Sequence, residues 1–159
     1  MSIRPAAEAD FAAIAAITNH YITTTTIHFA YDVVTADDLV TTWRGSRFPW
    51  LVTCEGERVL GYAKAGTYRD RAAYDRTTEL GLYLAPEACG RRLGTALYTE
   101  LVAEITRRGF HSAIAGIALP NEPSIKLHER LGFQSIGVVR EAGWKFDRWN
   151  DVAFCQLML

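Results

Sequence analysis

Hydrophobic positions recur with helical spacing in four stretches of the chain. The clearest is residues 93–108, where a leucine or isoleucine stands at every fourth position from Leu93 to Ile105. Gly109 follows at the point where such a helix ends with a left-handed cap. A capping box formed by Thr35 and Asp38 opens a shorter helix. The predicted helices are residues 11–18, 35–45, 93–108 and 120–131.

Other stretches are rich in strand-forming residues and are separated by short turns. Glu55-Gly56-Glu57 predicts the turn of a hairpin. Glu79 and Gly81 interrupt the apolar run of residues 77–84, which predicts a bulge or a bend in that strand. The order strand, helix, strand from Thr77 to Ile117 predicts a parallel pair, whereas the remaining strands connect as hairpins. The predicted strands are residues 2–4, 50–54, 58–68, 77–84 and 111–117, with two more within 134–145 and 149–158.

These elements predict an α/β fold with a mixed sheet, in a single domain that spans residues 1–159. A chain of 159 residues with 49% hydrophobic content is long enough for one core and short for two domains. The formal charge is −1 and the 17 Lys and Arg are dispersed, so neither nucleic acid nor a membrane is an expected partner. A small molecule is the expected partner.

The cysteines and the N-terminus indicate a reducing compartment. Cys54, Cys89 and Cys155 are far apart and lack the spacing of a zinc site or a disulfide framework. The N-terminal residues contain no apolar run of signal-peptide length. We therefore expect a cytoplasmic protein.

The loop between the strand 77–84 and the long helix has the composition of an anion site. It contains Gly90 and Gly94 together with Arg91 and Arg92, and it leads directly into a helix N-terminus. Free backbone N–H groups, the helix dipole and the guanidinium groups all favour a phosphate there. The loop matches neither the Walker A motif nor the dinucleotide fingerprint, so a different pyrophosphate-bearing ligand is expected. An ordinary surface loop is the alternative interpretation.

Several motifs resemble those of the phosphinothricin and methionine sulfone N-acetyltransferases of the GNAT superfamily, and the resemblance covers nearly the whole chain. The motifs are Gly61-Tyr62-Ala63, Arg69-Asp70-Arg71-Ala72-Ala73-Tyr74, Thr78-Glu79, Leu119-Pro120-Asn121, Leu127-His128-Glu129-Arg130-Leu131-Gly132-Phe133 and Gly143-Trp144-Lys145 with Trp149-Asn150-Asp151-Val152.

This resemblance implies the GNAT fold: a twisted, mostly antiparallel sheet of six to seven strands, about four flanking helices and a central strand, helix, strand unit that binds acetyl-CoA. The residues that it implies for acetyl-CoA are Leu82, Tyr83, Leu84, Cys89, Gly90, Arg91, Arg92, Leu93, Gly94, Thr95 and Asn121.

The chain departs from the family pattern at one position, because Arg92 stands where the first glycine of the loop is usual. If that position needs a positive φ, Arg92 would be strained by roughly 1–3 kcal/mol. Weaker binding of CoA is the expected consequence.

Acetylation needs the amine as its free base, so a general base close to the amine that receives the acetyl group is useful. Glu79 is the candidate, because an apolar strand raises the pKa of a carboxyl group. The resemblance further implies that His128 positions or deprotonates the amine and that Tyr98 protonates the departing thiolate. A salt-bridged strand glutamate, a core histidine and a core aromatic are the respective alternatives.

The acceptor is expected to be a small amino acid. Arg69, Arg71 and Tyr74 would lie beside it, since guanidinium groups bind a carboxylate bidentately. The resemblance implies that Phe29 and Tyr83 also line the acceptor pocket, and His28 stands where a small polar residue is common. A solvated charged loop is the alternative for residues 69–74.

The sequence thus predicts an acetyl-CoA-dependent N-acetyltransferase in which the amine attacks the thioester directly, without a metal. A covalent route through Cys89 is disfavoured because no histidine lies near it in the sequence. Acetylation of proteins or peptides and CoA binding without catalysis are the alternatives. The resemblance also implies a homodimer.

Overall fold

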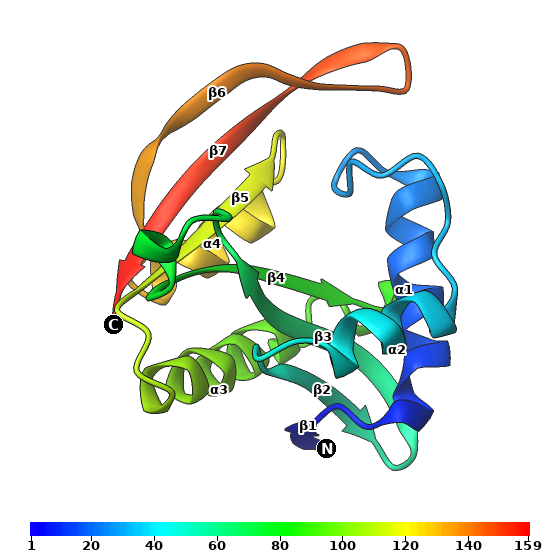
Figure 1. The fold of residues 1–159 in the computed structure, drawn as a ribbon. Helices are drawn as coiled ribbons and strands as arrows, with labels where there is room; N and C mark the ends of the chain where they lie inside the picture. Colours follow the sequence, from blue (N-terminus) through cyan, green and yellow to red (C-terminus); the bar gives the residue numbers. More distant parts are fainter.

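Seven strands form one sheet in the computed structural model, which describes residues 1–159 (Figure 1). They are β1 (Ser2–Pro5), β2 (Trp50–Glu55), β3 (Arg58–Thr67), β4 (Thr77–Leu84), β5 (Ser112–Ala118), β6 (Gln134–Lys145) and β7 (Arg148–Met158). The order across the sheet is β1-β2-β3-β4-β5-β7-β6, and every pair is antiparallel except β4 with β5. The predicted mixed, mostly antiparallel sheet is confirmed.

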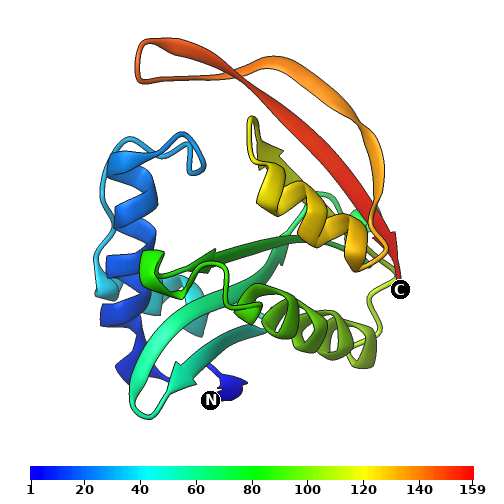
Figure 2. The same ribbon diagram turned by 180° about the vertical axis from the view of Figure 1, so that it is seen from behind.

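Four α-helices cover the two faces of this sheet. They are α1 (Phe11–Thr24), α2 (Ala36–Arg44), α3 (Leu93–Arg107) and α4 (Glu122–Arg130). Figures 1 and 2 show α1 and α2 on one face and α3 and α4 on the other. None of the helices combines the length and the apolar composition that a membrane span requires.

The helix boundaries follow from local chemistry. Thr35 and Asp38 form the predicted capping box at the start of α2. Gly109 follows α3 with a φ of 82°, as the left-handed cap requires. The apolar faces of α3 and α1 each bury a separate hydrophobic cluster, centred on Leu97 and Leu101 on one side of the sheet and on Phe11 and Ile14 on the other.

The feature that shapes the site is the divergence of β4 from β5. The two strands pair only through Thr77 to Glu79, whereas β4 stays paired with β3 as far as Leu84. The register between β3 and β4 has no shift, so the predicted bulge in β4 is wrong. The strand instead separates from one neighbour while it stays paired with the other, which opens a gap beside residues 80–84.

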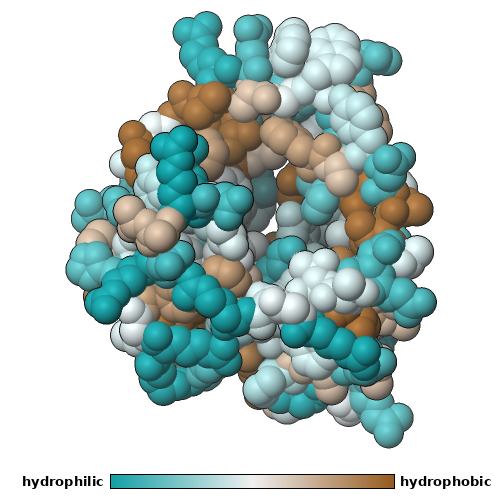
Figure 3. All heavy atoms as spheres, in the orientation of Figure 1, coloured by the Kyte–Doolittle hydropathy of each residue, from teal (hydrophilic) through white to brown (hydrophobic).

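The long hairpin of β6 and β7 reaches over this gap (Figure 1). Its two-residue turn is Phe146-Asp147, with φ of 51° and 55°, the conformation that matches the twist of antiparallel strands. The segment between α1 and α2 approaches the same hairpin from the other side. Figure 3 shows an opening near the middle of this face, below the hairpin.

Candidate functional site

The gap between β4 and β5 exposes backbone groups of β4. Ala85 N–H donates to the Leu60 carbonyl of β3 at 2.8 Å. In an antiparallel pair every second residue directs its backbone N–H and C=O to the same neighbouring strand, so Tyr83 and Gly81 also direct theirs to β3. By alternation, Leu82 and Leu84 direct theirs toward the gap. The Leu84 carbonyl accepts a hydrogen bond from the Tyr21 hydroxyl at 2.7 Å. The Leu82 N–H is thus a donor in the gap, which suits a ligand that extends alongside β4.

The N-terminus of α3 opens at the same gap and presents the free backbone N–H groups of its first turn there. Gly94 lies on the first turn of α3, and a Cβ there would come within 3.5 Å of Leu82 Cδ2 and 3.6 Å of Leu84 Cδ1. This close packing brings the free N–H groups of the helix next to the exposed part of β4. The predicted anion loop and the exposed strand therefore form one continuous surface that fits a long ligand with a pyrophosphate group.

The two arginines of this loop differ in their partners. Arg91 forms an ion pair with Glu55 at 2.9 Å, whereas Arg92 has no ion pair within the chain. Arg92 has φ 60° and ψ 11°, so the position does require the left-handed conformation that glycine adopts most easily. The folded chain carries this strain whether or not CoA is bound, so the strain lowers the free energy of unfolding. The expected weakening of CoA binding therefore does not follow from it.

The remaining residues predicted for acetyl-CoA lie around the gap in different environments. Leu93 is buried, so it can offer only backbone groups, while Thr95 is half-buried. Cys89 is exposed and its Sγ lies 4.0 Å from the Tyr21 hydroxyl, with no histidine among its contacts. Asn121 caps α4, since its Oδ1 accepts from Ser124 N at 3.3 Å, and its Nδ2 makes no hydrogen bond.

Glu79 is the last residue of β4 that pairs with β5, and the gap between these two strands begins there. Its side chain remains in contact with solvent, and the surrounding protein raises the pKa of its carboxyl group. The positive charges of Lys64 and Arg69 oppose this by lowering the same pKa. Glu79 is therefore a carboxylate whose charge interacts with two cations, and its pKa is shifted in the predicted direction.

Tyr98 and His128 lie together on the α3 and α4 face of the sheet. Tyr98 is 1% exposed, and its ring centroid lies 5.2 Å from that of His128. Burial raises the pKa of Tyr98 well above its usual range, and the charges of Cys155, Tyr83 and Glu79 add to this. The Tyr98 hydroxyl has no hydrogen-bond partner in the chain, so it is free to donate to a ligand.

His128 is buried between Tyr98 and Phe133, and its side chain has one unused nitrogen. Nδ1 donates to the Ser124 carbonyl at 2.8 Å, which leaves Nε2 as an acceptor, and Nε2 has no partner. Burial lowers the pKa of the ring, so it is held neutral. A fully satisfied core histidine would have no free acceptor, and His128 therefore remains a candidate for holding or moving a proton.

Tyr83 belongs to an aromatic cluster, and Phe29 follows His28, one member of that cluster, in the sequence. The Tyr83 ring lies 5.5 Å from Tyr62 and 5.7 Å from His28, measured between centroids. Phe29 packs against Gly143 of the β6–β7 hairpin. These side chains belong to segments far apart in the sequence, which the fold brings together beside β4 and the β6–β7 hairpin.

Arg69, Arg71 and Tyr74 line one cavity of about 310 Å³ at the start of β4. The hydrogen bond and charge of Tyr68 raise the pKa of Arg69, and the positive charge of Arg69 in turn lowers the pKa of Glu79. Arg71 is exposed and makes no side-chain hydrogen bond or ion pair. The structure thus places the three predicted residues together at the start of β4, and Arg69 is the one whose charge acts on Glu79.

Sequence reasoning missed Lys64 of β3, which lies on the same face of the sheet as Glu79. Its Nζ lies 4.6 Å from the Trp50 ring centroid, and burial lowers the pKa of its ammonium group. The signal was present, since Lys64 interrupts an apolar strand as Glu79 does.

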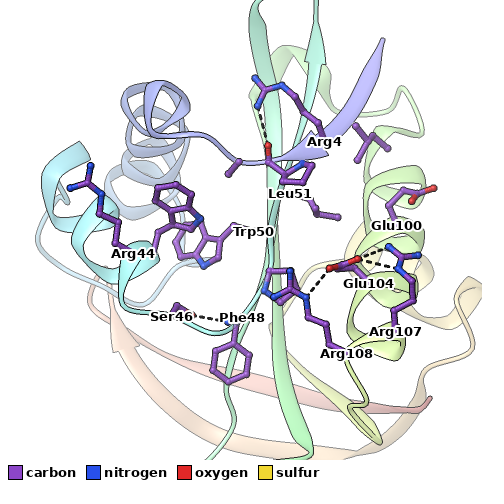
Figure 4. Close-up of a pocket in the computed structure, with 15 residues that line it drawn as sticks. Arg4, Arg44, Ser46, Phe48, Trp50, Leu51, Glu100, Glu104, Arg107 and Arg108 are labelled. Carbon is purple, nitrogen blue, oxygen red and sulfur yellow. Dashed lines mark hydrogen bonds and ion pairs between the residues drawn. The ribbon is translucent and has the colours of Figure 1, made fainter.

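A second cavity, of about 570 Å³, lies elsewhere (Figure 4). It is bounded by β1, β2, the end of α2 and the last turns of α3, and it contains none of the predicted site residues. Its arginines already have carboxylate partners: Arg4 pairs with Asp10, Arg44 with Glu8, and Arg107 and Arg108 with Glu104.

Comparison with known proteins agrees with this geometry. Residues 3–154 match the family described as acetyltransferase (GNAT) domain. The phosphinothricin N-acetyltransferase of Streptomyces viridochromogenes is 41% identical over 158 residues, covering 98% of this chain and 86% of that protein. The L-methionine sulfoximine/L-methionine sulfone acetyltransferase of Salmonella typhimurium is 37% identical, covering 100% of this chain and 95% of that protein.

Two solved structures have nearly the same fold as this chain. A Salmonella typhimurium acetyltransferase with its cofactor acetyl-CoA has a TM-score of 0.98 and 36% identity, covering 100% of this chain and 94% of that one. A ribosomal-protein-alanine N-acetyltransferase from Brucella melitensis has a TM-score of 0.97 and 34% identity, covering 100% of both chains.

Proposed function

Because the chain belongs to the GNAT acetyltransferase family, we propose that it moves the acetyl group of acetyl-CoA onto the amine of a small amino-acid-like acceptor. Phosphinothricin, methionine sulfone and methionine sulfoximine are the acceptor types that we expect. The observation that carries the proposal is the charge arrangement around Glu79: Lys64 lies on the same face of the paired strands β3 and β4, and the charges of Lys64 and Arg69 both act on the Glu79 carboxylate. An amino acid presents the complementary charges, an ammonium group for Glu79 and a carboxylate for the cations.

In this proposal the chain holds acetyl-CoA with the backbone of Leu82 and Leu84 and with the N-terminus of α3. The Leu82 N–H polarises the thioester carbonyl and stabilises the negative charge that develops on its oxygen. Arg92 and Asn121 offer donors that no group of the chain uses.

Glu79 accepts the proton that the ammonium group must lose before its nitrogen can attack. The new N–C bond then forms as the C–S bond breaks, and Tyr98 gives its hydroxyl proton to the departing thiolate. The nitrogen loses one further proton, which passes through solvent to the Tyr98 phenolate and restores its hydroxyl group. The products are the amide, the free thiol and the proton that Glu79 then releases to solvent. Because both substrates lie in the gap together, no covalent enzyme intermediate is needed.

The test is a continuous assay of thiol release with acetyl-CoA and a panel of acceptors. We expect turnover on phosphinothricin, methionine sulfone or methionine sulfoximine. Turnover confined to ordinary L-amino acids would support the proposed acetyl transfer but contradict the proposed acceptors. Tight CoA binding without turnover on any amine would overturn the proposal in favour of a non-catalytic CoA-binding protein.

A second candidate function is acetylation of a protein N-terminus, favoured by the similarity to the ribosomal-protein-alanine N-acetyltransferase. The cleft argues against it, because a peptide acceptor has no free α-carboxylate for Lys64 and Arg69 to bind. A peptide with an N-terminal alanine belongs in the same panel. Faster turnover on that peptide than on any amino acid would favour this second function.

We also propose that the protein is a cytoplasmic homodimer. The three free cysteines support a reducing compartment. The edge strand β6 supports self-association, because it exposes Ile136, Val138 and Val139 in a row of otherwise solvent-facing residues.

A further inference from the structure

The motif Gly143-Trp144-Lys145 with Trp149-Asn150-Asp151 lies on the β6–β7 hairpin and has no part in the reaction proposed above. It nevertheless contains a lysine that is only 4% exposed. Burial of an ammonium group is costly unless its protons find acceptors. The contacts of Lys145 therefore show what the motif does.

Lys145 joins the hairpin to two points of the opposite wall. Its Nζ donates to the Ile22 carbonyl at 2.6 Å and to the His28 carbonyl at 2.5 Å, and no carboxylate lies within ion-pair distance. Ile22 is in the last turn of α1, where carbonyl groups lack helical partners and the helix dipole is negative. The ammonium group thus caps α1 and holds the segment that follows it.

Three further contacts join the same two segments. A Cβ on Gly143 would lie 2.7 Å from Cδ2 of the Phe29 ring, so only glycine leaves room for this ring. The Tyr31 hydroxyl donates to the Trp144 carbonyl, and Arg148 donates to the Thr26 hydroxyl at 3.2 Å.

Other residues of the motif keep the hairpin in shape. Asn150 is 3% exposed, and its Nδ2 donates to the carbonyls of Gly143, Lys145 and Arg148, which surround the turn. The Asp151 carboxylate accepts from Glu141 N at 2.8 Å, beside the irregular pairing between Val139 and Gly143. The hairpin is therefore a fixed platform for Lys145.

The held segment carries side chains of the acceptor cleft. His28 lies against Tyr83, and its Nδ1 accepts from Ala30 N at 3.1 Å, so the neutral ring carries its proton on Nε2. Residues 25–34 have neither helix nor strand of their own. Their position over the cleft therefore depends on contacts with the hairpin.

We propose that Lys145 is a positioning residue, which fixes His28 and Phe29 over the acceptor cleft by holding residues 25–31 against the β6–β7 hairpin. The inference rests on the acceptor site of the proposed function. It assigns Lys145 to acceptor binding and leaves acetyl-CoA binding, on the far side of the gap, unaffected.

The test compares Lys145→Met with Lys126→Met, which removes an exposed lysine of α4 whose partner is Glu122. In Lys145→Met we expect KM for the acceptor to rise about tenfold or more, because the cleft wall is no longer preorganised, while KM for acetyl-CoA stays within about twofold. Hydrogen exchange of residues 25–31 should become faster. Lys126→Met should match the wild type in every measurement.

Gly143→Ala gives an independent test if Lys145→Met folds poorly. The added methyl group displaces the Phe29 ring and leaves Lys145 in place, so the same rise in acceptor KM is expected. Unchanged acceptor KM and unchanged exchange in both variants would overturn the proposal. Absence of wild-type turnover would overturn the proposed function instead, and the exchange measurement would still decide whether Lys145 holds the segment.

Discussion

At the scale of single residues, Glu79 predicts a specific dependence of activity on pH. An α-amine has a pKa near 8, so its deprotonation at pH 7 costs only about 1.4 kcal/mol. Replacing Glu79 by Gln should therefore lower kcat/KM about tenfold at pH 7, and the deficit should shrink toward pH 9 as solvent deprotonates the amine. Steady-state rates across this pH range measure the effect.

Glu57→Gln is the matched control for this experiment, because Glu57 is exposed in the β2–β3 turn and makes no ion pair. A Glu79→Gln protein with the wild-type rate at pH 7 would show that His128 or solvent serves as the base. A deficit that stays constant with pH would point to acceptor binding rather than to proton transfer.

Arg92 gives a second prediction at this scale, which concerns stability. A non-glycine residue in the left-handed region is strained by about 1–2 kcal/mol, and glycine is not. Arg92→Gly should therefore raise the free energy of unfolding by about 1 kcal/mol, a rise in Tm of about 2–4 °C. Thermal unfolding followed by circular dichroism measures it, with Arg91→Gly as the control that leaves the strain in place. Equal or lower stability of Arg92→Gly would contradict the prediction.

At the scale of elements, the junction between β1 and α1 depends on one carboxylate. Asp10 is buried and accepts two hydrogen bonds from Arg4, at 2.7 and 2.8 Å, and one from Ala7 N at 2.8 Å. The hydrogen bonds from Arg4 lower the pKa of Asp10. A carboxylate with a lowered pKa stabilises the fold above its unfolded pKa, and this contribution is lost as pH falls through the folded value.

Asp10→Asn should therefore lower the free energy of unfolding by about 1–3 kcal/mol near neutral pH. The difference from wild type should diminish below about pH 4, where the unfolded carboxyl group becomes protonated. Urea unfolding at several pH values measures both effects. A difference independent of pH would mean that packing rather than charge holds the junction.

The sequence predicted most elements to within a few residues, because each has its own local signal. Helix α3 follows from its leucine spacing and from Gly109, and the capping box marks the start of α2. The divergence of β4 from β5 has no such signal, since the loss of a backbone partner leaves the side-chain pattern unchanged. The polar residue and the glycine that suggested a bulge in fact stand where β4 separates from β5: Glu79 is the last residue paired with β5, and Gly81 lies beyond it.

At the scale of the whole molecule, the site depends on contacts that local patterns cannot predict. Phe29 and Gly143 lie more than a hundred positions apart, and the space that one leaves for the other appears only when the chain is folded. The same holds for Lys64 and Glu79, which belong to adjacent strands and face one cleft. Resemblance to a family supplied the residues of the site, whereas the structure supplied the reasons for their arrangement.

The edge strand β6 leads to the last prediction, on assembly. It ends the sheet over 12 residues and exposes Ile136 by 57% and Val138 by 50%, an arrangement that favours pairing with a second chain. Light scattering should give a mass twice the 17.7 kDa of one chain.

The double variant with Ile136→Lys and Val138→Lys should shift this mass to that of the monomer, whereas Val33→Lys, another exposed apolar position, should not. Because the gap, Glu79 and Tyr98 all belong to one chain, the monomeric variant should retain activity. A wild-type mass of one chain would contradict the dimer, and a loss of activity on dissociation would show that the partner completes the acceptor cleft.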